Sequence, residues 1–435
     1  MNSSTDAALS PAARETAADL AALVTASPSS FHAVREVARR LADAGFTELD
    51  ETAVWDRDAV RGDRFVIRDG AIIAWTAPGS ADAGTAFRIV GSHTDSPALK
   101  LKPNPDLESD GFAQVGVEIY GGPLLNSWLD RELRLAGCIS LRDGRTVLVE
   151  TPAALRVPQL AVHLDRAVNK DGLRLDPQRH MQPIIGLGEL DVLGWIAEHA
   201  GVEREDILGF DIVTVDSQEP ALFGAHDEFF ASARLDNLSS VYAETCALID
   251  VAGGDTPADA PIALMVANDH EEVGSATRSG AGGPFLEDVL VRIHAALGGD
   301  DASRRRVLAS SMVLSADAGH AAHPNYPERH DPVTRPRLGG GPMLKINAQQ
   351  RYATDAAGIA AFVRACEQAD VPHQQFVSNN AMPCGSTIGP ITATRLGMVT
   401  VDAGIPLLSM HSAREMCSPA DVLSLRGACA AFLRP

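Results

Sequence analysis

The sequence predicts an α/β protein, in which a mixed, mostly parallel sheet is sandwiched by helices and a second, β-rich domain is inserted. With 435 residues, the chain is longer than one hydrophobic core usually supports. After about residue 227, apolar strands alternate with helical patterns, which is typical of a buried, mainly parallel sheet. Between about residues 99 and 226 the pattern changes to short strands and tight turns. The expected domains are residues 1–98 with 227–435, and an insert of residues 99–226.

The first part of the chain is expected to form two helices and then strands. Apolar residues recur three and four positions apart over residues 11–23 and 30–44, with Ser30 as the expected cap of the second helix. Short β-rich runs follow, separated by an Asp-Gly turn and a Pro-Gly loop. These runs are residues 64–68, 71–75 and 87–90.

The insert and the last part of the chain differ in their expected elements. In the insert, strands are expected at residues 115–120, 133–141 and 146–150, the last two joined by a turn at Asp143 and Gly144. In the last part, the expected order is helix 237–249, strand 262–267, helix 285–296 and strand 312–314. Residues 324–342, rich in proline and glycine, form the longest expected loop, and long loops in compact domains are often functional.

Composition and charge exclude several classes of partner. The formal net charge of -20 argues against binding to nucleic acid or to an anionic membrane surface. The six cysteines are scattered and are expected to be free thiols. Residues 1–26 lack the apolar core of a signal peptide, and no run reaches the roughly 18 apolar residues of a membrane span. A cytoplasmic protein is therefore expected.

Five polar clusters lie at or just after expected strand ends, where open α/β sheets place their ligand sites. Together they supply imidazoles and carboxylates, a donor set that suits zinc, with cobalt or manganese as alternatives. The clusters are His93-Thr94-Asp95, Leu235-Asp236-Asn237, Asp269-His270-Glu271-Glu272, Asp317-Ala318-Gly319-His320 and Met410-His411-Ser412.

Two of these clusters have ordinary alternatives. On an extended strand end, His93 and Asp95 point the same way, so the Asp95 carboxylate could fix the tautomer of a metal-bound His93. The alternative is a surface turn. Asp236 could bridge two metal ions, one oxygen to each, or could simply cap a helix.

The adjacent pair Glu271 and Glu272 suggests a division of labour between a general base and a metal ligand. Neighbouring carboxylates repel each other unless cations neutralise one of them, although a charged solvated loop is the alternative. Asp317 and His411 could each be a ligand or a structural hydrogen-bonding group. Five suitable placements at strand ends jointly favour a bimetallic hydrolase.

With these residues in view, the chain resembles the aspartyl aminopeptidase family of dinuclear zinc metallopeptidases over nearly its full length. The stretches that carry the resemblance are GSHTDSP (91–97), SARLDN (232–237), DHEEVGS (269–275), ADAGH (316–320), HPNY (323–326), KIN (345–347), QRYAT (350–354), PCGSTIGP (383–390) and MHSARE (410–415).

The resemblance implies two divalent metal ions in a fold of the zinc-peptidase type. One ion would be held by His93, Asp236 and Asp317, and the other by Asp236, Glu272 and His411. Glu271 would be the base. The insert would be a dimerisation domain, and six dimers would form a tetrahedral homododecamer.

The same resemblance implies roles for three further residues. His163 would reach a neighbouring subunit's site and stabilise the oxyanion, whereas the alternative is a buried strand histidine. Lys345 would pair with the acidic side chain of the substrate, and its alternative is a surface lysine that extends to solvent. Tyr352 would line the same pocket.

The expected activity is hydrolysis of the first peptide bond in peptides with a free N-terminal Asp or Glu, by a metal-bridging hydroxide with Glu271 as base. One alternative keeps the metals but changes the substrate, giving a broad aminopeptidase, a carboxypeptidase or a deacylase. Another alternative is a non-catalytic assembly protein, against which the presence of Glu271 beside five candidate ligands argues.

Overall fold

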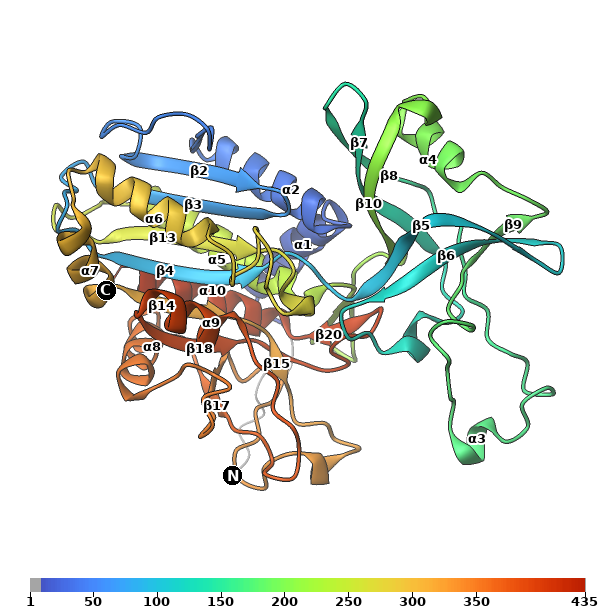
Figure 1. The fold of residues 1–435 in the computed structure, drawn as a ribbon. Helices are drawn as coiled ribbons and strands as arrows, with labels where there is room; N and C mark the ends of the chain where they lie inside the picture. Colours follow the sequence, from blue (N-terminus) through green and yellow to red (C-terminus); the bar gives the residue numbers. More distant parts are fainter. Residues whose placement is uncertain (1–8, 435) are drawn as a thin grey trace.

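The chain forms two units that lie side by side, each built on its own sheet (Figure 1). The computed structural model describes residues 9–434. Residues 1–8, which belong to the segment expected to lack an export signal, and residue 435 lie outside the described residues. Among residues 9–434, no helix combines the length and apolar composition needed to cross a membrane.

A nine-stranded sheet forms the centre of the larger unit. In spatial order its strands are β1 (Thr47–Glu48), β2 (Gly62–Arg68), β3 (Ala71–Ala77), β13 (Ile262–Asn268), β4 (Phe87–His93), β14 (Met312–Ala316), β18 (Val399–Gly404), β16 (Met343–Lys345) and β17 (Gln374–Phe376). The parallel pairs are β1–β2, β13–β4, β4–β14, β14–β18 and β16–β17, and the other three pairs are antiparallel. The predicted mixed, mostly parallel sheet is confirmed.

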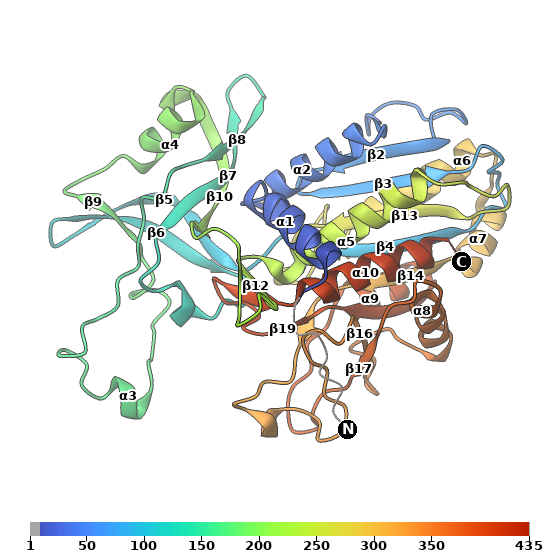
Figure 2. The same cartoon turned by 180° about the vertical axis from the view of Figure 1, so that it is seen from behind.

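Helices cover both faces of this sheet (Figures 1 and 2). One face packs against α1 (Pro11–Thr25), α2 (Ser30–Asp43), α5 (Leu235–Ala252), α8 (Ala356–Gln368) and α10 (Pro419–Leu433). The other packs against α6 (Phe285–Ala296), α7 (Asp301–Ser310) and α9 (Ile388–Leu396).

The central strands are apolar throughout because both of their faces are buried. In β3, Ile72 and Ala74 belong to the core on the α5 face, whereas Ile73 and Trp75 belong to the core on the α6 face. Successive side chains of a strand point to opposite faces, so a continuous apolar run fills two cores at once.

The second unit is a six-stranded antiparallel sheet with its own apolar core. In spatial order its strands are β8 (Thr146–Glu150), β7 (Leu133–Leu141), β10 (Ile207–Asp216), β5 (Ala98–Ser109), β6 (Phe112–Tyr120) and β9 (Ile184–Leu187). It also carries α4 (Val192–Ala200), the short α3 (Val168–Asp171), and the 3-10 helices Leu125–Trp128 and Arg204–Asp206.

Two small sheets complete the structure. One contains β11 (Ala221–Phe223), β12 (Phe229–Ser232) and β20 (Glu415–Cys417), and the other contains β15 (Gly319–His320) and β19 (Pro406–Leu407). Two further 3-10 helices are Glu271–Val273 and Pro327–Arg329. The strand β11 lies within the predicted insert, but it pairs with β12, which follows the insert in the sequence. The boundaries 99–226 therefore stay a prediction.

Most expected elements occur at the expected places, but the expected cap of α2 is wrong, and so is the alternative of Asp236 as a cap. Ser29, not Ser30, caps α2, because Ser29 has extended backbone angles and its hydroxyl accepts the amide of His32. Asp236 is not a cap, since Arg234 occupies the cap position of α5 and Asp236 lies inside with non-helical angles. The six cysteines are free, as expected.

Candidate metal centre

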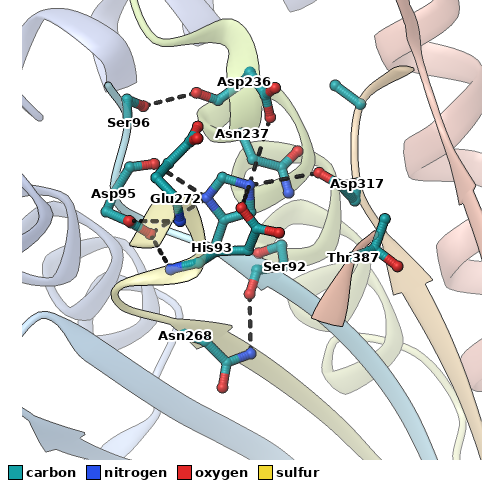
Figure 3. Close-up of polar contacts among 12 residues, drawn as sticks. Ser92, His93, Asp95, Ser96, Asp236, Asn237, Asn268, Glu272, Asp317 and Thr387 are labelled. Carbon is teal, nitrogen blue, oxygen red and sulfur yellow. Dashed lines mark hydrogen bonds and ion pairs between the residues drawn. The ribbon is translucent and has the colours of Figure 1, made fainter. Parts of the chain in front are cut away.

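The candidate residues meet at the carboxyl ends of three neighbouring parallel strands. His93 ends β4, Glu271 and Glu272 follow β13, and Asp317 follows β14. Because β13, β4 and β14 are adjacent and parallel, their carboxyl ends lie at one edge of the sheet. Asp236, at the start of α5, projects into the same place (Figure 3).

The side chains form two groups that share Asp236. His93 Nε2 lies 3.5 Å from Asp236 Oδ1 and 3.4 Å from Asp317 Oδ1. His411 Nε2 lies 3.7 Å from Asp236 Oδ2 and 3.3 Å from Glu272 Oε2. Asp236 therefore offers one oxygen to each group, which is the geometry of a bridging carboxylate.

Within each group, the potential ligand atoms lie within 4.8 Å of one another. The two groups are His93, Asp236 and Asp317, and Asp236, Glu272 and His411; a third, His93, Glu271 and Glu272, overlaps both. The structure thus brings together all five residues predicted as metal ligands and the predicted base. Their roles as ligands and base stay predictions.

Both histidines present the same ring nitrogen to the carboxylates. His93 Nδ1–H donates to the backbone oxygen of Asp95 at 3.0 Å, and His411 Nδ1–H donates to the backbone oxygen of Gly122 at 2.9 Å. A carbonyl only accepts, so each Nδ1 carries a proton and each Nε2 is left to bind a metal.

The Asp95 carboxylate has a different main contact from the one expected. Asp95 Oδ1 lies 3.4 Å from His93 Nδ1, whereas the backbone oxygen of Asp95, which accepts the ring proton, lies nearer, at 3.0 Å. The two carboxylate oxygens instead accept the amides of Glu271 at 3.0 Å and Glu272 at 3.1 Å. The chain leaves β4 at His93, so the two-residue alternation of a strand no longer sets the direction of Asp95. Asp95 therefore fixes the backbone of the Glu-Glu pair.

Several acidic groups of this cluster are buried close together. Burial, together with the neighbouring carboxylates of Asp317 and Asp236, raises the pKa of Glu271 to about 7. Burial, with Asp236 beside it, also raises the pKa of Glu272 well above its usual value. Asp236 Oδ1 and Glu272 Oε1 are buried without a hydrogen-bond partner. Buried acceptors need compensating positive charge, so this set of N and O donors fits divalent metal ions.

Lys345 lies at the site but is already paired. Its side chain is 2 % exposed, and Nζ donates to Asp317 Oδ2 at 2.8 Å and to the backbone oxygen of Ala318 at 2.7 Å. Although burial opposes it, the ammonium holds the pKa of Asp317 well below its usual range. The Tyr352 ring lies 5.4 Å from Nζ. The alternative of a solvent-exposed lysine is wrong, and the roles of Lys345 and Tyr352 in selecting substrate stay predictions.

His163 lies outside this cluster within one subunit. It is exposed and belongs to no strand, so the alternative of a buried strand histidine is wrong. Its segment leaves the six-stranded sheet toward α3, away from the nine-stranded sheet (Figure 1). The predicted role of His163 in a neighbouring subunit stays a prediction.

Sequence analysis missed Glu415 as a member of the site. This buried carboxylate accepts the amide of Asp236 at 2.9 Å and the amide of His411 at 2.7 Å, so it links the two candidate ligands. The signal was present, because Glu415 lies four residues after His411 in the stretch 410–415. Ser96, whose hydroxyl donates to the Asp236 backbone oxygen at 2.7 Å, supports the same residue (Figure 3).

Imidazoles and carboxylates gathered at the strand ends of an open α/β sheet define a metallohydrolase. The chain belongs to the M18 peptidase family of zinc metallo-aminopeptidases. The family model described as "Aminopeptidase I zinc metalloprotease (M18)" matches residues 23–433. A probable M18 family aminopeptidase 2 of Streptomyces coelicolor is 52% identical over 424 residues, covering 96% of this chain and 97% of the relative.

Solved structures agree with this assignment. The chain matches the structure of Ape4 in complex with Nbr1 at 35% identity and a TM-score of 0.92, over 97% of this chain and 86% of that one. It matches the S. cerevisiae mApe1 dodecamer at 27% identity and a TM-score of 0.82, over 96% of this chain and 95% of that one. The resemblance at the level of metallo-aminopeptidase is therefore confirmed.

Proposed function

We propose that this aminopeptidase removes N-terminal Asp or Glu from peptides. The observation that carries the acidic preference is Lys345, a buried cation within a cluster of carboxylates. Two of its three N–H groups are used by Asp317 and Ala318, so one remains for a substrate carboxylate. The Tyr352 ring lies beside it and would line the same pocket. A local cation of this kind would offset the repulsion between an acidic substrate and an acidic protein.

The proposed cofactors are two divalent metal ions, zinc in the first place. One would be held by His93, Asp236 and Asp317, and the other by Asp236, Glu272 and His411, because these are the groups whose ligand atoms converge. When bound, such ions lower the pKa of water and polarise the carbonyl of the scissile bond.

Glu271 is the proposed general base. Its carboxylate is not needed to complete either group, and its Oε2 lies 3.9 Å from His93 Nε2, at the edge of the site. A pKa near 7 lets a carboxylate accept a proton from water and deliver it to the leaving amine at neutral pH. Asp95 orients this base by accepting its backbone amide.

Oligomerisation would complete the site. His163 is exposed on a segment that extends from the six-stranded sheet, so a second copy of the chain could receive it. We propose that residues 99–226 form the dimerisation domain and that six dimers build a tetrahedral homododecamer. The support is the likeness to mApe1, whose structure is a dodecamer.

A broad aminopeptidase is the second candidate. The observation that favours it is the same lysine, because an ammonium that neutralises Asp317 could serve the metal centre alone. Specificity would then come from the shape of the pocket, and acidic residues would have no advantage.

Hydrolysis of Asp-, Glu-, Leu- and Lys-anilides, with chelator and with added zinc, cobalt or manganese, tests the proposal. Metal-dependent release from Asp and Glu alone is the expected result. Equal or faster release from Leu would contradict the acidic preference and leave the broad aminopeptidase.

A further inference from the structure

The end of β6, in the six-stranded sheet, touches the metal centre of the other unit. Three consecutive residues, Tyr120, Gly121 and Gly122, reach three different parts of the centre. We propose that this tripeptide is a positioning element of the metal centre, which sets the geometry of Glu272 and His411 from outside the nine-stranded sheet. The inference rests on the proposed two-metal site.

Tyr120 acts on the Glu-Glu pair through Asp95. Its hydroxyl donates to Asp95 Oδ2 at 2.8 Å, and the same oxygen accepts the Glu272 amide at 3.1 Å. Burial raises the pKa of Tyr120, so the hydroxyl stays protonated and donates. Since Asp95 also accepts the Glu271 amide, the hydroxyl braces the one carboxylate that holds the backbone of both glutamates.

Gly122 acts on His411 directly. Its backbone oxygen accepts the Nδ1 proton at 2.9 Å and thereby directs Nε2 toward Asp236 and Glu272. A second hydrogen bond lies two residues further along the chain, where the Leu124 amide donates to the backbone oxygen of His411 at 2.8 Å. A carbonyl in this position fixes both the tautomer and the ring orientation of a metal-binding histidine.

Gly121 explains why the segment can approach so closely. Its φ is +71°, a conformation that residues with a side chain rarely adopt. A Cβ added there would lie 3.1 Å from Glu272 Cβ and 3.4 Å from Pro97 Cα. Gly122 is different, because an added Cβ would meet His411 Nδ1 at 3.5 Å, an ordinary contact.

Two members of the Asp236–Glu272–His411 group are thus held by one tripeptide. Further backbone contacts to this group come from Glu415, which accepts the amides of Asp236 and His411, and from Ser96, which donates to the Asp236 oxygen; both residues lie outside the six-stranded sheet. Displacement of the six-stranded sheet would therefore move Glu272 and His411 relative to Asp236. Metal binding at this group should depend on how the two units sit against each other.

The test compares metal binding by full-length variants with matched controls. Tyr120→Phe removes only the hydroxyl, and Gly121→Ala adds a methyl group close to Glu272 and strains the backbone at a positive φ. The controls are Tyr242→Phe, which removes a buried hydroxyl in α5, and Gly111→Ala, which adds a methyl group at a φ of +82° with open space around it. Metal-free protein is titrated with Co²⁺, read by its visible absorption, and with Zn²⁺ in competition with a chromogenic chelator.

We expect the wild type and both controls to bind two ions with affinities within about 3-fold of one another. Tyr120→Phe and Gly121→Ala should weaken one of the two binding events. The upper range is roughly 10- to 100-fold, the usual effect of losing a direct partner of a metal ligand. The Co²⁺ spectrum of the weakened site should also change. Should Gly121→Ala fail to fold, Tyr120→Phe still decides the matter.

Two results would overturn the inference in distinguishable ways. Wild-type protein that binds no ion would remove the proposed two-metal site and this inference with it. Wild-type protein that binds two ions, with Tyr120→Phe unchanged in both affinities and in its Co²⁺ spectrum, would overturn the positioning role alone.

Discussion

Replacing Lys345 by methionine separates two roles that its ammonium could have. Lys345 Nζ donates to Asp317 Oδ2 at 2.8 Å and to the backbone oxygen of Ala318 at 2.7 Å. Methionine keeps an unbranched side chain in this buried position but leaves both oxygens without this donor. If the ammonium also contacts the substrate, the variant loses a contact that only acidic substrates make. If it serves Asp317 alone, every substrate suffers equally.

The expected magnitudes follow from burial. Removing one partner of a buried ion pair costs about 3–5 kcal/mol, so the Tm of the metal-free Lys345→Met protein should fall clearly. A hydrogen bond between charged groups contributes about 1.5–3 kcal/mol. The kcat/KM ratio of Asp-anilide to Leu-anilide should therefore drop by roughly 10- to 150-fold, at 1.4 kcal/mol for each factor of ten.

The assay is kcat/KM for both anilides at saturating zinc. The control is Lys102→Met, since the Lys102 ammonium donates to Gln178 Oε1 at 3.3 Å within the unit of the six-stranded sheet. An unchanged ratio with a common fall for both substrates would refute selection by Lys345 and leave it as a partner of Asp317. A Lys345→Met protein with the Tm, the metal affinity and the Asp-to-Leu ratio of kcat/KM of the wild type would refute both roles.

Four further experiments test the base, the metals and the oligomer. Glu271→Gln should lower kcat by about 10²- to 10⁴-fold, because general-base catalysis contributes that much, while bound metal is retained. In the wild type, kcat/KM should fall as the pH drops through the pKa of Glu271, because only the ionised carboxylate accepts a proton. Burial raises this pKa to about 7, and bound cations would lower it. Metal removal should lower Tm more at pH 8 than at pH 5, since the same raised pKa means that the metal-free fold loses stability as rising pH ionises Glu271. His163→Ala should lower kcat by about 10²- to 10³-fold with the oligomer intact, because it removes one donor to the oxyanion.

Each of these expectations has an outcome that contradicts it. A near-normal kcat of Glu271→Gln would contradict its role as the base. Loss of bound metal, measured by elemental analysis, would contradict the expectation that the variant retains its metal. A kcat/KM that rises as the pH falls below 7 would exclude a carboxylate base, and an equal Tm change at both pH values would show that ionisation of Glu271 is not coupled to metal binding. For His163→Ala, unchanged kcat in an oligomer of normal size would remove the residue from the reaction.

The helices and strands were largely predictable because their signals are local. The strand β7 and the helix α6 have the bounds that apolar spacing and turn residues predicted, and His93 and Asp317 fall at strand ends as expected. Caps were less predictable, since Ser29 and Ser30 are both suitable residues and only backbone geometry chooses between them.

Residue type and position at strand ends by themselves determined the candidate set of ligands and the base. Convergence of that set depended on the order of β13, β4 and β14, which joins residues far apart in the chain. Only the tertiary structure decided the partners around this set. The Asp95 carboxylate accepts the amides of Glu271 and Glu272. The Lys345 ammonium donates to Asp317, and the backbone oxygen of Gly122 accepts the ring proton of His411. Such contacts depend on how whole units pack, and no short-range pattern encodes that packing.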